Sequence, residues 1–205
     1  MDLPCHGESR YDGEKCSIKE IAEEVFNILH VFKIKQPVII GHSLGGYVGL
    51  ELLKLIEGKL ILLHSNFWED SKEKKADRDR VINIVRRGTE LFVREAIPGL
   101  FAPENVSKCM KDIDKLVSRA LQIPANEVAA ATAGMRDRKA NYEIMNSKDV
   151  SIIHGESDPI IPTDVLQNQI TKLKKTPKVI TLKGCGHMSI WENRPGLIEA
   201  IEYLL

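Results

Sequence analysis

The sequence lacks the features that would tie a chain to nucleic acid or to a membrane. Its 205 residues carry 29 basic and 29 acidic side chains, so no excess of charge favours nucleic acid or an acidic surface as a partner. No N-terminal apolar run is typical of a signal peptide, and no stretch approaches the roughly 18 apolar residues of a membrane span. We therefore expect a cytoplasmic protein that binds neither nucleic acid nor a membrane.

Cysteine is scarce, and the sequence has no glycine-rich phosphate loop or dinucleotide fingerprint. The four cysteines are Cys5, Cys16, Cys109 and Cys185. They show neither close pairing nor metal-ligand spacing, which favours reduced thiols. His64 and His154 end predicted strands, from which their side chains could reach a site at the strand ends, but neither is paired with other ligands at metal spacing. We expect no metal and no cofactor.

The most informative feature that is present is a serine between glycines after an apolar strand. Residues 38–40 lead into the segment 41–46, Gly-His-Ser-Leu-Gly-Gly, and an apolar helix is expected over 44–56. This pattern is typical of a nucleophile elbow, where side chains in place of the glycines would collide at a cramped turn. A plain helix N-cap is the alternative reading of Ser43, but a cap does not require glycine on both sides. We predict that Ser43 is a nucleophile.

An orienting acid and a base follow along the chain, as a serine nucleophile requires. Two further apolar strands are predicted at 150–154 and 179–182, and each ends in a glycine-containing loop. Asp158 lies in the first loop and His187 in the second, 29 residues later. We predict that Asp158 is the acid and His187 the base, in the chain order serine, acid, histidine.

Each of these assignments has an alternative. Asp158 precedes a proline and could merely begin a turn, and Asp70, after the preceding strand, is a rival acid. Asp158 is favoured because it alone lies in the expected loop. His187 could be an ordinary loop histidine. His42 is next to Ser43, but we expect it to point to the other side of the turn and to have a packing role.

Four motifs together make the chain resemble an α/β-hydrolase-fold protein of the esterase, lactonase and peroxidase-like group. They are the loop at 2–9, the elbow at 41–46, the acid loop at 155–162 and the histidine loop at 184–195. The resemblance implies an acyl-enzyme formed on Ser43, with the backbone N–H of Leu44 as one oxyanion donor and a loop after the family's third strand as the other. The sequence departs from the family pattern at Cys5, where the family usually has glycine.

Ser17 with Glu20 is typical of a capping box, and the helix predicted after it has one apolar face, formed by Ile21, Val25, Ile28, Leu29 and Phe32.

The alternation of strands and helices predicts one composite α/β domain with a mostly parallel sheet. Residues 1–65 and 148–205 are expected to form the α/β-hydrolase core, and 66–147 a helical cap inserted after the strand at 59–64. Apolar residues of this segment could line a substrate pocket or simply be core. They are Phe67, Trp68, Phe92, Leu100, Phe101 and Met135. The charge run at 72–80 is expected to be a solvated face.

By comparison with the family, the chain is expected to be N-terminally truncated, without the first strands and the second oxyanion loop. The strand before Ser43 is then left near an exposed edge, through which we expect self-association. The sequence predicts a serine hydrolase of a small carboxylic ester, lactone or thioester. The alternative is a non-hydrolytic binding protein or pseudoenzyme on the same fold, and related chemistry such as carbon–carbon bond cleavage uses the same residues.

Overall fold

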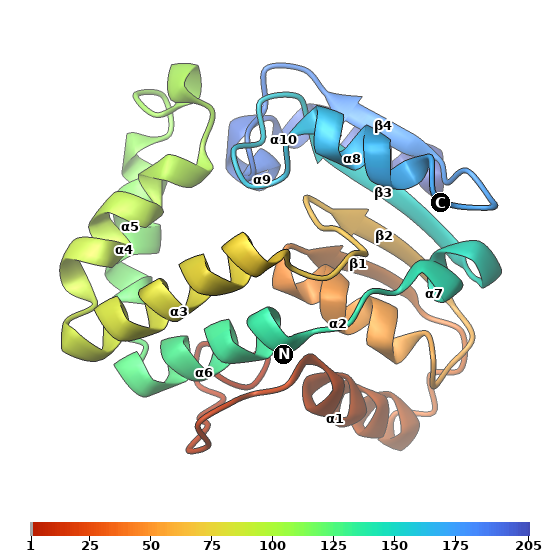
Figure 1. The fold of residues 1–205 in the computed structure, drawn as a ribbon. Helices are drawn as coiled ribbons and strands as arrows, with labels where there is room; N and C mark the ends of the chain where they lie inside the picture. The colour runs from red at the N-terminus through yellow and green to blue at the C-terminus, as the bar shows by residue number, and fades with distance from the viewer. Residues whose placement is uncertain (1) are drawn as a thin grey trace.

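A four-stranded parallel sheet lies at the centre of the computed structural model, which describes residues 2–205 (Figure 1). The strands are β1 (Val38–His42), β2 (Lys59–Leu63), β3 (Asp149–Gly155) and β4 (Val179–Leu182), in the spatial order β1-β2-β3-β4. All three pairings are parallel. The four carboxyl ends therefore share one edge of the sheet, which is where α/β proteins place their sites. The predicted α/β fold class is confirmed.

Helices cover both faces of this sheet because its central strands are apolar on both sides. In β2, Leu60 and Leu62 pack towards α2 (Leu44–Leu52), α7 (Tyr142–Ser147) and α8 (Thr163–Ile170). The alternate residues Ile61 and Leu63 pack towards α10 (Arg194–Leu204) on the opposite face. Such a continuous apolar run is the mark of a strand buried between two helical layers.

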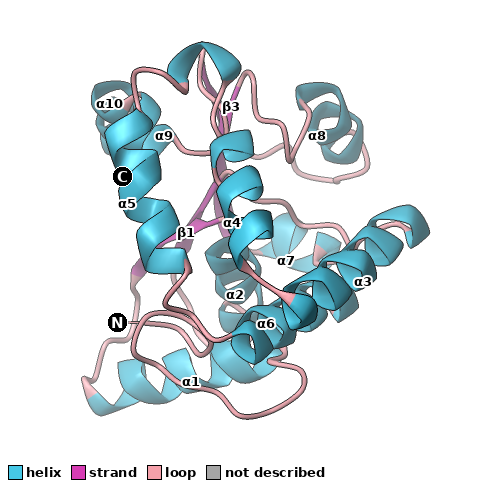
Figure 2. Cartoon of the chain, turned by 90° about the vertical axis from the view of Figure 1, so that its left-hand side faces the viewer, coloured by secondary structure: helices cyan, strands magenta, loops and turns pink. Residues whose placement is uncertain are grey.

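Five α-helices lie between β2 and β3 in the chain, and we call residues 66–147 the helical insertion. They are α3 (Lys72–Arg87), α4 (Glu90–Ala96), α5 (Met110–Ala120), α6 (Ala125–Asp137) and α7, with the short 3₁₀ turns Pro98–Leu100 and Pro103–Asn105. α3 and α6 pack along each other beside the sheet (Figures 1 and 2). The apolar sides of α4 and α5 meet Met188, next to the predicted base. The insertion therefore reaches the carboxyl edge of the sheet.

The first helix, α1 (Ile18–Val31), packs on α2 and begins as predicted. The Ser17 hydroxyl accepts from the Glu20 backbone at 3.2 Å, and the Glu20 carboxylate accepts from the Ser17 backbone at 3.0 Å, which confirms the capping box. The expected apolar face is wrong at its far end, where Ile28 is 40% and Phe32 71% exposed. The helix α2, on which α1 packs, was expected to reach residue 56 and ends at Leu52.

The remaining helices follow the last two strands. α9 (Ser189–Glu192) and α10 come after β4, and α8 comes after β3. Within residues 2–205, no helix combines the length and the apolar composition that crossing a bilayer requires.

Candidate active site

Ser43 occupies the sharp turn between β1 and α2. Its backbone has φ 50° and ψ −116°, a conformation that residues other than glycine rarely adopt. Two hydrogen bonds hold it there: its N–H donates to the Leu63 carbonyl at 3.0 Å, and its carbonyl accepts from the Ser65 hydroxyl at 2.7 Å. Both partners belong to β2 or the segment that follows it, so the neighbouring strand stabilises the turn.

The glycines of this turn do not all serve the same purpose. A Cβ on Gly41 would lie 2.5 Å from the Gly45 carbonyl oxygen and 2.6 Å from the Gly46 Cα, so the predicted collision is confirmed there. A Cβ on Gly46 would lie 2.3 Å from the Ser65 hydroxyl. The same expectation is wrong at Gly45, where a Cβ would meet nothing within 4 Å, because this side of the helix start faces open space.

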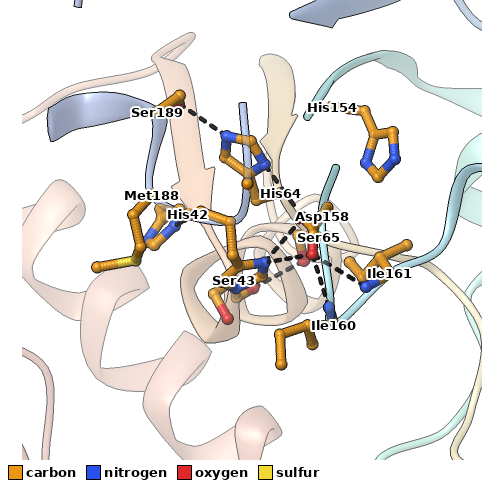
Figure 3. Close-up of polar contacts among 12 residues, drawn as sticks. His42, Ser43, His64, Ser65, His154, Asp158, Ile160, Ile161, Met188 and Ser189 are labelled. Carbon is orange, nitrogen blue, oxygen red and sulfur yellow. Dashed lines mark hydrogen bonds and ion pairs between the residues drawn. The ribbon is translucent and has the colours of Figure 1, made fainter. Parts of the chain in front are cut away.

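Asp158 and His187 are brought together by the loops that follow β3 and β4. His187 Nδ1 lies 2.9 Å from Asp158 Oδ2 and 3.1 Å from Oδ1, and both side chains are buried. The carboxylate also accepts from the backbone N–H groups of Ile160 at 2.8 Å and Ile161 at 3.0 Å (Figure 3). Asp158 is therefore held by contacts on both of its oxygens.

These contacts decide the charge of the acid. Burial opposes ionisation of Asp158, but hydrogen bonds from His187 and His64 outweigh it and hold the pKa of Asp158 well below its usual range. The carboxylate is therefore ionised at neutral pH. A charged carboxylate accepts but does not donate, so each histidine that contacts it carries the proton on the nitrogen that faces it.

His64 is a partner of Asp158 that the sequence does not reveal. Its Nδ1 lies 3.2 Å from Asp158 Oδ2, and its Nε2 lies 2.7 Å from the Ser189 hydroxyl (Figure 3). Asp158 follows His64 by 94 residues and Ser189 follows it by 125, so no local pattern links the three. The available signal was that His64 and Asp158 follow strands whose carboxyl ends meet at one edge.

His42 also lies at this site, and its ring packs beside that of His187, with the ring centroids 5.3 Å apart. Its Nε2 donates to the His187 carbonyl oxygen at 2.9 Å, because the loop after β4 crosses over the end of β1. The backbone N–H of His187 donates to the Leu100 carbonyl at 2.8 Å. The position of His187 is thus set by β1, by the helical insertion and by Asp158. Burial lowers the pKa of His42 to about 4.

His154 completes a group of residues that could hold a metal ion. Single ligand atoms of His64, His154 and Asp158 lie within 4.8 Å of one another, a grouping that their spacing in the sequence did not indicate. Each of the three already has a hydrogen-bond partner, which for His154 Nε2 is the Thr163 hydroxyl at 3.2 Å. A cation would have to displace these bonds.

The rival acid Asp70 is engaged elsewhere. Its carboxylate lies 2.7 Å from Arg78 Nε and 2.8 Å from Arg138 Nη1, and it is buried between them. Asp70 and both partners lie within the helical insertion. Asp70 is thus part of an ion-pair network that connects α3 with the segment after α6.

Two cavities each include one residue that is drawn near Ser43 in Figure 3. One of about 700 Å³ is lined by Met188, by Ile97 and Leu116 of the insertion, and by Arg119. The other, of about 620 Å³, is lined by Ile160 and residues of α3 and α8. Met188 and Ile160 lie on either side of Ser43 in Figure 3.

Of the six apolar residues considered from the sequence, Trp68 lines the second cavity. The others pack into hydrophobic clusters: Phe67, Phe92, Leu100, Phe101 and Met135. The departure from the family pattern at Cys5 also has a structural counterpart, since its φ of 68° is a value that favours glycine. All four cysteines are free and buried, and Cys5 and Cys16 share one cluster despite their separation in the sequence.

Comparisons with known proteins bear on the family and the fold. The sequence profile of the "Alpha/beta hydrolase family" matches residues 1–200. The dihydrolipoyllysine-residue acetyltransferase component of the acetoin cleaving system of Pseudomonas putida is 26% identical over 195 residues, which are 92% of this chain and 50% of that protein. The chain thus spans half the length of the curated relative that it matches.

Solved structures resemble the chain over nearly its whole length. A thermophilic esterase from Thermogutta terrifontis has a TM-score of 0.88 and 25% identity, with 98% of this chain and 76% of that chain covered. The enol-lactonase from Burkholderia xenovorans LB400 has a TM-score of 0.85 and 14% identity, with 99% and 78% covered. The second likeness concerns the fold alone.

Proposed function

Because the chain belongs to the alpha/beta hydrolase family, whose members are typically hydrolases, we propose that it is a serine hydrolase of small carboxylic esters, lactones or thioesters. The observation that carries the proposal is the buried contact between Asp158 and His187, reached by the loops after β3 and β4. It lies at the same edge of the sheet as the strained turn of Ser43. An orienting acid, a base and a nucleophile are the three groups that this chemistry needs.

The proton transfers follow from the tautomer of His187. With its Nδ1–H donated to the ionised Asp158, Nε2 of the neutral imidazole has a free lone pair. His187 takes the hydroxyl proton of Ser43 through this nitrogen as the serine oxygen attacks the acyl carbon. Asp158 stabilises the imidazolium that results and stays ionised. His187 returns the proton to the leaving group, and then activates a water that releases the acid from the acyl-enzyme.

The developing oxyanion needs donors that are in place before the reaction. Leu44 is the first residue of α2, where a backbone N–H has no partner within the helix, and it follows Ser43 directly. We assign the N–H of Leu44 to the oxyanion. In this proposal residues 66–147 act as a cap over the core formed by 1–65 and 148–205.

Labelling with a fluorophosphonate tests the nucleophile. The reagent should form a covalent adduct that peptide mass spectrometry maps to Ser43, and Ser43→Ala should not label. Ser118→Ala, which removes an exposed serine hydroxyl on α5, is the control and should still label at Ser43. A folded protein in which Ser43 stays unmodified would contradict the proposal and favour a binding protein on the hydrolase fold.

A further inference from the structure

The side chain of His64 takes no part in the proton transfers described above, yet it contacts the candidate acid. The residue directly follows β2 with φ 46°, and its backbone N–H donates to the Ile153 carbonyl at 2.9 Å. This bond to β3 fixes the backbone from which the ring extends. The side chain is fully buried, so its two ring nitrogens depend on Asp158 and Ser189 as partners.

One tautomer of His64 satisfies both contacts. Asp158 accepts only, so a bare Nδ1 at 3.2 Å from its Oδ2 would set a lone pair against a negative charge. With the proton on Nδ1, a neutral ring has a bare Nε2 that accepts from the Ser189 hydroxyl at 2.7 Å. Burial lowers the pKa of His64, against the opposing effect of its bond to Asp158, and so favours the neutral ring.

We propose that His64 is a positioning residue for Asp158, which it orients by donating Nδ1–H to Oδ2 while Ser189 fixes its tautomer. The inference rests on the proposed hydrolase function, in which Asp158 orients His187. The two histidines approach the same carboxylate, and their ring centroids are 5.6 Å apart. The backbone donors of Ile160 and Ile161 reach Oδ1, whereas His64 holds Oδ2.

This arrangement has a consequence for the reaction. When His187 becomes positively charged, its proton must not pass to Asp158, because the carboxylate then no longer stabilises the imidazolium. A second donor on Oδ2 makes the carboxylate a weaker base and keeps its plane in line with His187. Loss of that donor is expected to slow the chemical step rather than weaken substrate binding.

The test compares three variants in a nitrophenyl-ester assay. In His64→Ala the donor is lost, and kcat should fall about tenfold with KM changed less than about twofold. His64→Asn tolerates the positive φ and offers an amide N–H at the place of Nδ1, so it should recover most of kcat. Ser189→Ala removes a single buried oxygen and should show a smaller loss in the same direction. His30→Ala, at an exposed histidine of α1, is the control and should leave kcat and KM unchanged.

A second measurement does not depend on activity. Long-range ¹H–¹⁵N spectra of the parent protein should show His64 protonated on Nδ1, and Ser189→Ala should weaken the preference for that tautomer. If the parent does not hydrolyse esters, the proposed function fails. The tautomer of His64 still shows whether its Nδ1–H is donated to Asp158. The inference is overturned if His64 is protonated on Nε2, or if His64→Ala lowers the melting temperature but leaves kcat unchanged. If His64→Ala does not fold, Ser189→Ala decides. The inference is overturned if His64 in that variant is a mixture of tautomers and kcat is nevertheless the same as in the parent.

Discussion

At the scale of single residues, the two buried carboxylates near the ends of β2 and β3 have different partners. Asp158 contacts two histidines and two backbone N–H groups, whereas Asp70 contacts Arg78 and Arg138. The same residue type is thus hydrogen-bonded to histidines in one place and ion-paired with arginines in the other. We therefore expect substitution of Asp158 to lower activity and substitution of Asp70 to lower stability.

Asp158→Asn should lower turnover by about 10³- to 10⁴-fold with little loss of stability, because an amide can hold the imidazole in the wrong tautomer. Asp70→Asn should instead destabilise the fold by about 3–5 kcal/mol, since it leaves the buried Arg138 without its counter-charge. Steady-state kinetics and urea unfolding of both variants check this pair. The acid would move to Asp70 if its variant lost turnover while Asp158→Asn kept it.

The buried histidines predict how stability depends on pH. The pKa of His42 is lowered by burial from 6.5 to about 4, so the unfolded chain binds a proton that the folded chain does not over that range. Stability must then fall as the pH drops from about 6.5 towards 4. His64 and His154 are shifted in the same direction by burial, and they add to the slope. The lowered pKa of Asp158 adds a contribution that is lost at still lower pH.

His42→Asn should flatten this dependence. The variant removes one titrating group, and such a group changes the free energy of unfolding by up to about 1.4 kcal/mol for each pH unit. The free energy of unfolding, measured with urea at several values between pH 4.5 and 7, should fall less steeply than in the parent. His30→Asn, at an exposed histidine of α1, is the control and should leave the slope unchanged. Equal slopes for the parent and His42→Asn would refute the prediction.

At the scale of elements, the turn from β1 to α2 has no room for a Cβ at Gly41 or Gly46, whereas Gly45 has open space. Gly41→Ala should destabilise the protein by several kcal/mol, because its Cβ would press on backbone atoms of Gly45 and Gly46 that cannot move independently. Gly45→Ala should be neutral or should stabilise by up to about 1 kcal/mol, since alanine is the better helix former and the space is open. Thermal unfolding of the two variants tests this difference in stability. Equal decreases in melting temperature would contradict the steric argument.

At the scale of the whole molecule, β1 is an edge strand. Within residues 2–205 it pairs with β2 on one side, and its other edge pairs with no strand. The side chains of Val38 and Ile40 are 51% and 45% exposed. They lie on the face of the sheet that α10 covers at β2 but leaves uncovered at β1. An apolar edge with free backbone donors and acceptors is a template for another strand. We propose that a second copy of this chain pairs there.

Ile40→Lys should shift the protein towards the monomer, because a lysine on an edge strand opposes strand addition. Sedimentation velocity over a range of concentrations measures the shift. Leu91→Lys changes another exposed apolar residue, on α4 away from the sheet, and should leave the association unchanged. A parent protein that stays monomeric at high concentration would remove the basis for the proposal.

The sequence by itself determined the features that depend on neighbouring residues. The strand that leads to Ser43, the capping box of α1 and the apolar strands before Asp158 and His187 follow from side-chain periodicity and from glycine, which act over a few residues. The order of these motifs along the chain identified the α/β-hydrolase family, and the family match and the parallel sheet confirm it.

Only the tertiary structure decided which distant side chains meet. His64, Asp158 and Ser189 converge because parallel strands bring their carboxyl ends to one edge, and the distances there depend on the strand register and the path of each loop. The side of the turn on which His42 lies was set by the loop that carries His187. Spacing in the sequence carries none of this information, since contacts across a sheet depend on packing between elements rather than on separation along the chain.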